Sequence, residues 1–290
     1  MLRVNSLPHW ASRVPNSLTA RLIQVVDRFF DPTPLRSDRY DGRFLLALGG
    51  VLVFTLLAYW SLMDFWDVAW YAGEDGVSEW WTVATYLIAG ITVAVTALLM
   101  TRLGHRRIGL VYALLALAFV VVAMEEISWG QRLFDWSTPE ALASVNEQRE
   151  TGLHNITGLD RVFRTAFFLA ALLGLVGAGA RTLLHRHRRV TTADFFLPSL
   201  ILVPPLVGIV IWIWGGQSYP GNILRTLMID LDIRPVGSEV PEVLSGLAIL
   251  LYTYDNLKRA LGLRRATATY QDDRHSGDPG PRRSLSNLKA

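Results

Sequence analysis

The hydrophobic residues of this chain are gathered into long runs, and short polar stretches separate one run from the next. A helix needs about 20 mostly apolar residues to cross the roughly 30 Å hydrocarbon core of a bilayer. Six stretches meet this requirement, at residues 44–63, 81–100, 109–126, 162–180, 195–214 and 240–256. The pattern predicts an all-α fold, a polytopic transmembrane helix bundle of about six spans.

The polar stretches divide the chain into three predicted regions. Residues 1–43 hold seven Arg and no long apolar core, unlike a cleaved signal sequence. Part of this segment fits an amphipathic helix on the cytoplasmic membrane surface, although a short solvated helix fits the same spacing. Residues 44–257 form the six-span domain. Residues 258–290 end in a stretch rich in Gly, Pro and Ser, and the whole segment is expected to be a disordered cytoplasmic tail.

Proline positions single out the stretch at 195–214. Pro198, Pro204 and Pro205 each lack the backbone N–H that a helix interior uses. We therefore expect this span to be kinked, and kinked spans often line a cavity.

Composition and charge agree with a membrane location. Hydrophobic residues make up 51% of the chain and charged residues only 18%. The positive-inside rule orients the bundle, because 22 of the 28 Lys and Arg fall in the segments that six spans would place on one side. Both termini are therefore expected in the cytoplasm, in a multi-pass protein of the inner (plasma) membrane. The basic excess reflects this orientation, so membrane lipids, and no nucleic acid, are the expected partners. The absence of Cys excludes disulfides and Cys nucleophiles.

Two adjacent carboxylates, Glu125 and Glu126, end the third apolar run. Negative charge is disfavoured at the C-terminal end of a helix, and ionisable groups near the membrane are expensive. Arg132, Arg149 or a bound cation could stabilise them. If the helix continued past them, Glu125, Ser128 and Arg132 would share one stripe. This pair is the strongest indication of a functional site in the chain.

Other polar residues are expected on the same side of the membrane. Glu150 and His154 are four residues apart, a spacing that pairs an acid with an imidazole if the segment is helical. Glu79 and Glu242 open the second and sixth spans, and with Glu126 they could bind a divalent cation through oxygen ligands. The helix dipole also favours acids in a first turn, without any site. No cofactor is specified. The candidate catalytic residues are Glu125, Glu126, Glu150 and His154, and the candidate substrate-binding residues are Ser128, Gln131, Arg132, Asn146, Gln148 and Asn155.

A set of motifs spans roughly residues 70–250: GEDGVSEWW, EEISWGQRLF, TPE, NEQRETGLHN and EVPE. As a set, with the pattern NxQxExxLHN, they resemble a family of uncharacterised bacterial polytopic membrane proteins. The resemblance implies that Glu74, Asp75 and the candidate residues above belong to one constellation. It implies no particular reaction.

Three functions fit these observations. The first is a membrane-embedded enzyme that acts on a lipid or lipid-linked substrate at the outer face, as a hydrolase or transferase. The second is a noncatalytic scaffold whose outer loops bind a lipid or a partner. The third is a cation-coupled transporter. The inner halves of the spans contain almost no ionisable residue except Asp255, and this scarcity argues against a complete polar path.

Overall fold

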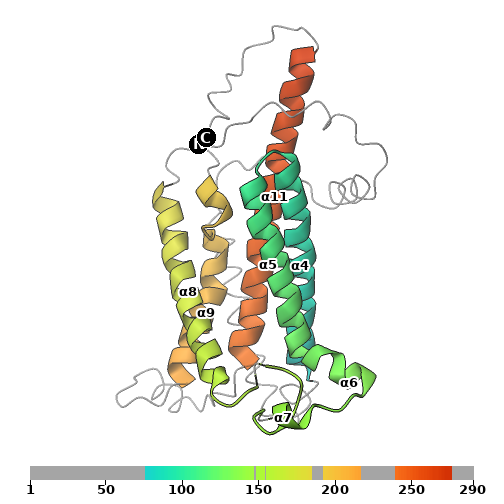
Figure 1. Cartoon of the computed structure of the whole chain (residues 1–290). Helices are drawn as coiled ribbons and strands as arrows, with labels where there is room; N and C mark the ends of the chain where they lie inside the picture. The colour runs from blue at the N-terminus through green and yellow to red at the C-terminus, as the bar shows by residue number, and fades with distance from the viewer. Residues whose placement is uncertain (1–75, 147, 154, 185–191, 217–238, 276–290) are drawn as a thin grey trace.

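A computed structural model describes residues 76–146, 148–153, 155–184, 192–216 and 239–275 of the chain (Figure 1). Within these ranges the fold is all-α, and the only strand-like pairing is one isolated bridge between Asn146 and Ile156. Four segments are long and apolar enough to cross a membrane: Ser78–Arg102, Arg106–Glu126, Arg161–Thr182 and Thr192–Trp214. They coincide with four of the six predicted runs. The run at 44–63 and the segment 1–43 lie outside the described residues, so the count of six and the orientation stay predictions.

Helices α4 (Val77–Arg102) and α5 (Arg106–Glu126) form a tight antiparallel hairpin. The turn between them is a Schellman motif, in which His105 N–H bonds Met100 O at 2.8 Å and Gly104 N–H bonds Thr101 O at 3.1 Å. Gly104 has a φ of +88°, the left-handed conformation that this motif assigns to glycine. We call this end of the bundle, at residues 103–105, the turn end.

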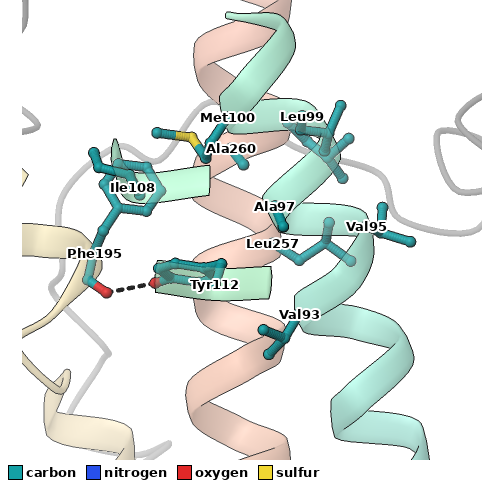
Figure 2. Packing of buried hydrophobic residues seen from close by; sticks show 11 residues of the cluster. Val93, Val95, Ala97, Leu99, Met100, Ile108, Tyr112, Phe195, Leu257 and Ala260 are labelled. Atoms are coloured by element: carbon teal, nitrogen blue, oxygen red, sulfur yellow. Dashed lines mark hydrogen bonds between the residues drawn. The ribbon is translucent and has the colours of Figure 1, made fainter. Parts of the chain in front are cut away.

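Helix α11 (Glu239–His275) runs alongside the hairpin and packs against α4 (Figure 1). Near the turn end the two helices bury an apolar cluster that includes Val93 and Leu99 of α4 and Leu257 of α11, with Tyr112 of α5 and Phe195 joining it from the side (Figure 2). The helices also approach closely farther down, where Gly246 faces Thr85. A methyl group added at Gly246 would lie only 2.3 Å from Thr85 Oγ1.

The remaining segments cover the other side of α11. Helix α8 (Leu159–Leu184) packs against α9 (Val203–Gly216), and α9 packs against α11. Two short 3₁₀ helices precede α9, η3 (Thr192–Phe195) and η4 (Leu200–Leu202). The predicted kink in this span is confirmed as a full break, with Pro198 between the two 3₁₀ helices. Pro204 and Pro205 lie in the first turn of α9, where a missing N–H removes no helical bond.

The structure corrects the predicted start of the tail. Helix α11 continues without a break from the predicted span to His275, so residues 258–275 are helical rather than disordered. The reason is that Ala260 and Leu261 are fully buried in the same cluster as Leu257, and this packing extends the helix. Residues 276–290 lie outside the described part of the chain.

Large apolar side chains are exposed along α5 and α8. On α5 they include Leu110, Leu114 and Leu117, and on α8 they include Leu173 and Val176. Water disfavours such a continuous apolar surface, whereas lipid accommodates it. The exposed faces therefore agree with helices that cross a membrane.

Candidate functional site

At the end of the bundle opposite the turn end, residues 127–146, 148–153 and 155–158 lie between α5 and α8, and we call this region the loop end (Figure 1). It contains η1 (Ser128–Gly130), α6 (Gln131–Phe134) and α7 (Glu140–Ala143). Helix α5 stops at Glu126 because Ser128, Trp129 and Gly130 have φ values of 47°, 58° and 83°. The prediction of one helical stripe through Glu125, Ser128 and Arg132 is therefore wrong, because left-handed residues cannot continue an α-helix.

The Glu125 carboxylate bonds to the loop that follows it. Its Oε1 accepts a hydrogen bond from Trp129 Nε1 at 2.5 Å, and its Oε2 accepts one from the Leu153 backbone N–H at 2.6 Å. These donors stabilise negative charge at a helix C-terminus, where the dipole opposes it. Hydrogen bonds from the loop therefore provide part of the stabilisation that the charge of Glu125 needs at this helix end.

Ser128 and Glu150 are both buried within the loop end, and Ser128 Oγ donates a hydrogen bond to Glu150 Oε2 at 2.5 Å. Asn146 holds the backbone around Glu150. Its Oδ1 accepts from the N–H groups of Gln148 and Glu150 at 3.0 and 3.2 Å, and its Nδ2 donates to Gly152 O at 2.6 Å. Three residues predicted for the site, Ser128, Asn146 and Glu150, therefore lie within one hydrogen-bonded unit.

Gln131 connects the two halves of the loop. Its Oε1 accepts from Thr151 Oγ1 at 2.7 Å, from Thr151 N–H at 2.8 Å and from Thr138 Oγ1 at 3.0 Å. Elsewhere in the loop, Asn155 Nδ2 donates to Gln148 Oε1. The structure thus brings most of the predicted loop residues together, although their hydrogen bonds serve largely to build the loop.

Some predicted residues cannot be placed. Glu74, Asp75 and His154 lie outside the described residues, as does the side chain of Arg132. Residues 150–153 form bends and irregular chain rather than helix, so the helical spacing that would pair Glu150 with residue 154 is not formed.

A second polar group lies inside the bundle near the loop end, where α4, α5 and α11 meet. The buried Tyr86 hydroxyl and Ser245 Oγ are 3.1 Å apart. Because Ser245 Oγ donates to the Glu242 backbone carbonyl at 2.7 Å, Tyr86 is the donor of this pair. The carboxylates of Glu126 and Glu242 both lie close enough to Tyr86 to interact with it electrostatically. Charges from two different helices therefore influence one buried hydroxyl.

The predicted three-carboxylate cation site is not formed. Among the described residues, no three His, Asp or Glu side chains lie close enough to share a metal ion. Glu79 is one of the three predicted ligands, and it precedes Tyr86 by about two helical turns, which is about 10 Å along the helix axis.

A charged cluster that the sequence analysis missed lies buried toward the turn end. Arg181 of α8 is within 3.4 Å of Asp194 Oδ1 and 3.7 Å of Asp255 Oδ2, and Arg259 of α11 also pairs with Asp255. All four side chains are almost completely buried. The sequence signals were present, because Asp194 opens an apolar run and Asp255 and Arg259 are four residues apart. The predicted spans end at residues 180 and 256, so Arg181 and Arg259 fall just outside them, among the basic residues of the cytoplasmic side.

This cluster forms around the break in the fifth span. Arg259 Nη1 donates to the Asp194 carbonyl at 2.5 Å, and Arg181 Nη1 donates to the Leu197 carbonyl at 3.2 Å. The hydroxyls of Tyr112 and Tyr252 both donate to the Phe195 carbonyl, the latter at 2.8 Å (Figure 2 shows the former). Backbone carbonyls released by a broken helix need such donors within a membrane.

Comparison with protein-family models, curated proteins and solved structures found no match to this chain.

Proposed function

We propose that this chain is a multi-pass membrane enzyme that acts on a lipid or lipid-linked substrate at the loop end. The observation that carries the proposal is the buried hydroxyl pair of Tyr86 and Ser245, which the negative charges of Glu126 and Glu242 influence from two other positions in the bundle. Ionisable groups at the ends of membrane spans are costly, and function is a common reason to retain them. A hydroxyl pair and two carboxylates in one region of the bundle supply the kinds of group that proton transfer requires.

In this proposal Glu126 and Glu242 divide the roles of general base and general acid. The hydrogen bond from Tyr86 to Ser245 fixes the orientation of the Tyr86 hydroxyl. General acid–base catalysis contributes typically about 10²- to 10⁴-fold to a rate. His154 is a further candidate for this proton transfer, and Arg132 is the candidate partner for a phosphate group.

The loop would then act as the preorganised wall of the site. Glu125, Glu150, Gln131 and Asn146 already accept hydrogen bonds within it, so we assign them to positioning rather than to proton transfer. A wall held by its own bonds keeps its geometry when a substrate arrives. A lipid substrate would reach it by lateral diffusion.

The experiment compares lipid extracts of cells that lack the gene with extracts of cells that express the full chain or a variant. Glu126→Gln and Glu242→Gln should each reproduce the accumulated species of the deletion, with a normal yield of monodisperse protein. Glu140→Gln, which changes an exposed acid of the same loop, should behave like the unchanged chain. Normal lipid extracts for both site variants would reject the enzyme and leave the noncatalytic scaffold.

A cation-coupled transporter is the second candidate, and the buried cluster around the broken span favours it. Transporters often place charged residues and interrupted helices together near the membrane interior. The relevant measurement is proton flux into vesicles containing the purified chain. Flux that is lost in Asp255→Asn but retained in Glu126→Gln, at equal folded yield, would favour transport over the lipid enzyme.

A further inference from the structure

The segment from Trp129 to Trp136 exposes several large apolar side chains, while Gln131 within it bonds into the loop. Gln131 turns into the loop, where Thr138 and Thr151 donate to it. Leu133, Phe134 and Trp136 are exposed over 56%, 73% and 44% of their surfaces. We call residues 129–136 the aromatic segment. A loop that faced only water would show the reverse arrangement.

The backbone holds this arrangement at a conformational cost. Ser128, Trp129 and Gly130 precede α6 in the left-handed region, and Asp135 follows it with a φ of 54°. Non-glycine residues adopt this conformation rarely and at some cost, so the surroundings must maintain it. Ser128 is fixed by its buried bond to Glu150. The Phe134 and Trp136 rings are stacked with centroids 5.9 Å apart.

The position of the segment indicates what covers it. It begins three residues after Glu126, the last residue of a candidate membrane span, and α6 lies beside the same ends of α4 and α5 in Figure 1. The first turns of α4 expose two more Trp side chains, Trp80 and Trp81. Exposed apolar residues also continue up α5 from Val121 and Val120. The aromatic segment therefore lies directly after a candidate membrane span, at the same end of the bundle as the exposed Trp80 and Trp81.

Tryptophan and its aromatic neighbours concentrate where headgroups meet acyl chains, because their rings are amphipathic. We propose that the aromatic segment is a membrane-interface anchor that inserts Leu133, Phe134 and Trp136 into the lipid surface on the loop-end side. The anchor holds the loop against the bilayer and fixes its height relative to the spans. It does not depend on the enzymatic proposal, since a scaffold or transporter would use the same contact.

The absence of Cys from the chain makes a direct depth measurement practical. The full chain carrying Phe134→Cys is labelled with a nitroxide, reconstituted into phosphatidylcholine nanodiscs and exposed to oxygen or to a water-soluble nickel complex. Leu114→Cys, exposed midway along α5, is the lipid reference, and Glu140→Cys, exposed in α7 of the same loop, is the water reference. Trp136→Cys provides a second position if Phe134→Cys yields too little folded protein.

The proposal expects oxygen to relax the label at residue 134 or 136 more efficiently than nickel does, by a ratio several-fold above that at residue 140. An equal ratio at 134, 136 and 140 would place the segment in water and overturn the proposal. Protection from both reagents would overturn it as well, because protein would then cover the segment. Dipolar broadening that depends on labelled fraction would identify that protein as a second copy, and its absence would identify another part of this chain.

Discussion

At the loop end, single side chains accept hydrogen bonds from residues that are distant in the sequence. The Gln131 amide oxygen serves three donors, two of them on Thr151. The Glu125 carboxylate similarly accepts a hydrogen bond from the Leu153 backbone N–H across the loop. Because a buried or half-buried donor without an acceptor loses about 1–3 kcal/mol, each acceptor here stabilises a segment distant in sequence.

Replacing Gln131 tests this role at the residue scale. Gln131→Leu removes the acceptor of the Thr151 N–H, so amide hydrogen exchange in residues 148–153 should accelerate by roughly fivefold or more, as expected for a loss of about 1 kcal/mol. Gln131→Glu keeps an acceptor oxygen at the same place and should retain most of the protection. Unchanged exchange in Gln131→Leu, measured by mass spectrometry, would contradict the role of this amide.

At the scale of elements, glycines set how closely the helices approach. Gly246 of α11 faces Thr85 of α4 with no room for a methyl group, whereas Gly262 of the same helix has no neighbouring atom within 4 Å of such a group. Close contact through small residues is the usual way in which membrane helices gain packing energy. The close approach of α4 and α11 at Thr85 therefore requires glycine at residue 246.

These two glycines form a matched pair for a stability measurement. Gly246→Ala should lower the thermal midpoint of the detergent-purified protein, because overpacking costs about 1–3 kcal/mol. Gly262→Ala should leave the midpoint unchanged or raise it slightly, since Ala is favoured over Gly in helices by roughly 0.5–1 kcal/mol. Equal midpoints for the two variants would show that Thr85 moves aside without cost.

At the scale of the whole molecule, polar groups concentrate near the two ends of an apolar bundle, and α11 connects them. Glu242 and Ser245 lie toward the loop end, and Asp255 and Arg259 lie toward the turn end, about 20 Å farther along the helix. The second group ties α8, η3 and α11 together around the broken span. We expect it to be the main polar contribution to the stability of this half of the bundle.

Breaking the cluster should therefore destabilise the entire chain. Arg259→Met removes the closer of the two arginines that pair with Asp255, and removing one partner of a buried pair costs about 3–5 kcal/mol. The double variant Asp255→Leu/Arg259→Met retains the Arg181–Asp194 pair without an excess charge and should recover part of the loss.

Lys258→Met is the control on the same helix, because Lys258 makes only a longer contact, 5.6 Å from the Tyr254 ring centroid. Its expected change is below about 1 kcal/mol. Monodisperse yield and thermal midpoint are measured for Arg259→Met, for the double variant and for Lys258→Met. A midpoint for Arg259→Met equal to that of Lys258→Met would refute a stabilising role of the cluster.

The sequence by itself determined the helical class, four segments of membrane length, the interruption of the fifth span that its prolines predicted as a kink, and the location of Ser128, Gln131, Asn146 and Glu150 at one end of the bundle. Apolar run length, proline and the separation of charges along the chain are local properties, so they can be read without tertiary contacts. Only the tertiary structure decided the left-handed conformation of residues 128–130 that follows α5, because the buried partner of Ser128 is 22 residues away. It also decided the Arg181–Asp194–Asp255–Arg259 cluster and the electrostatic influence of Glu126 and Glu242 on Tyr86. These groups come from helices far apart in sequence, and their meeting depends on helix packing that no local pattern specifies.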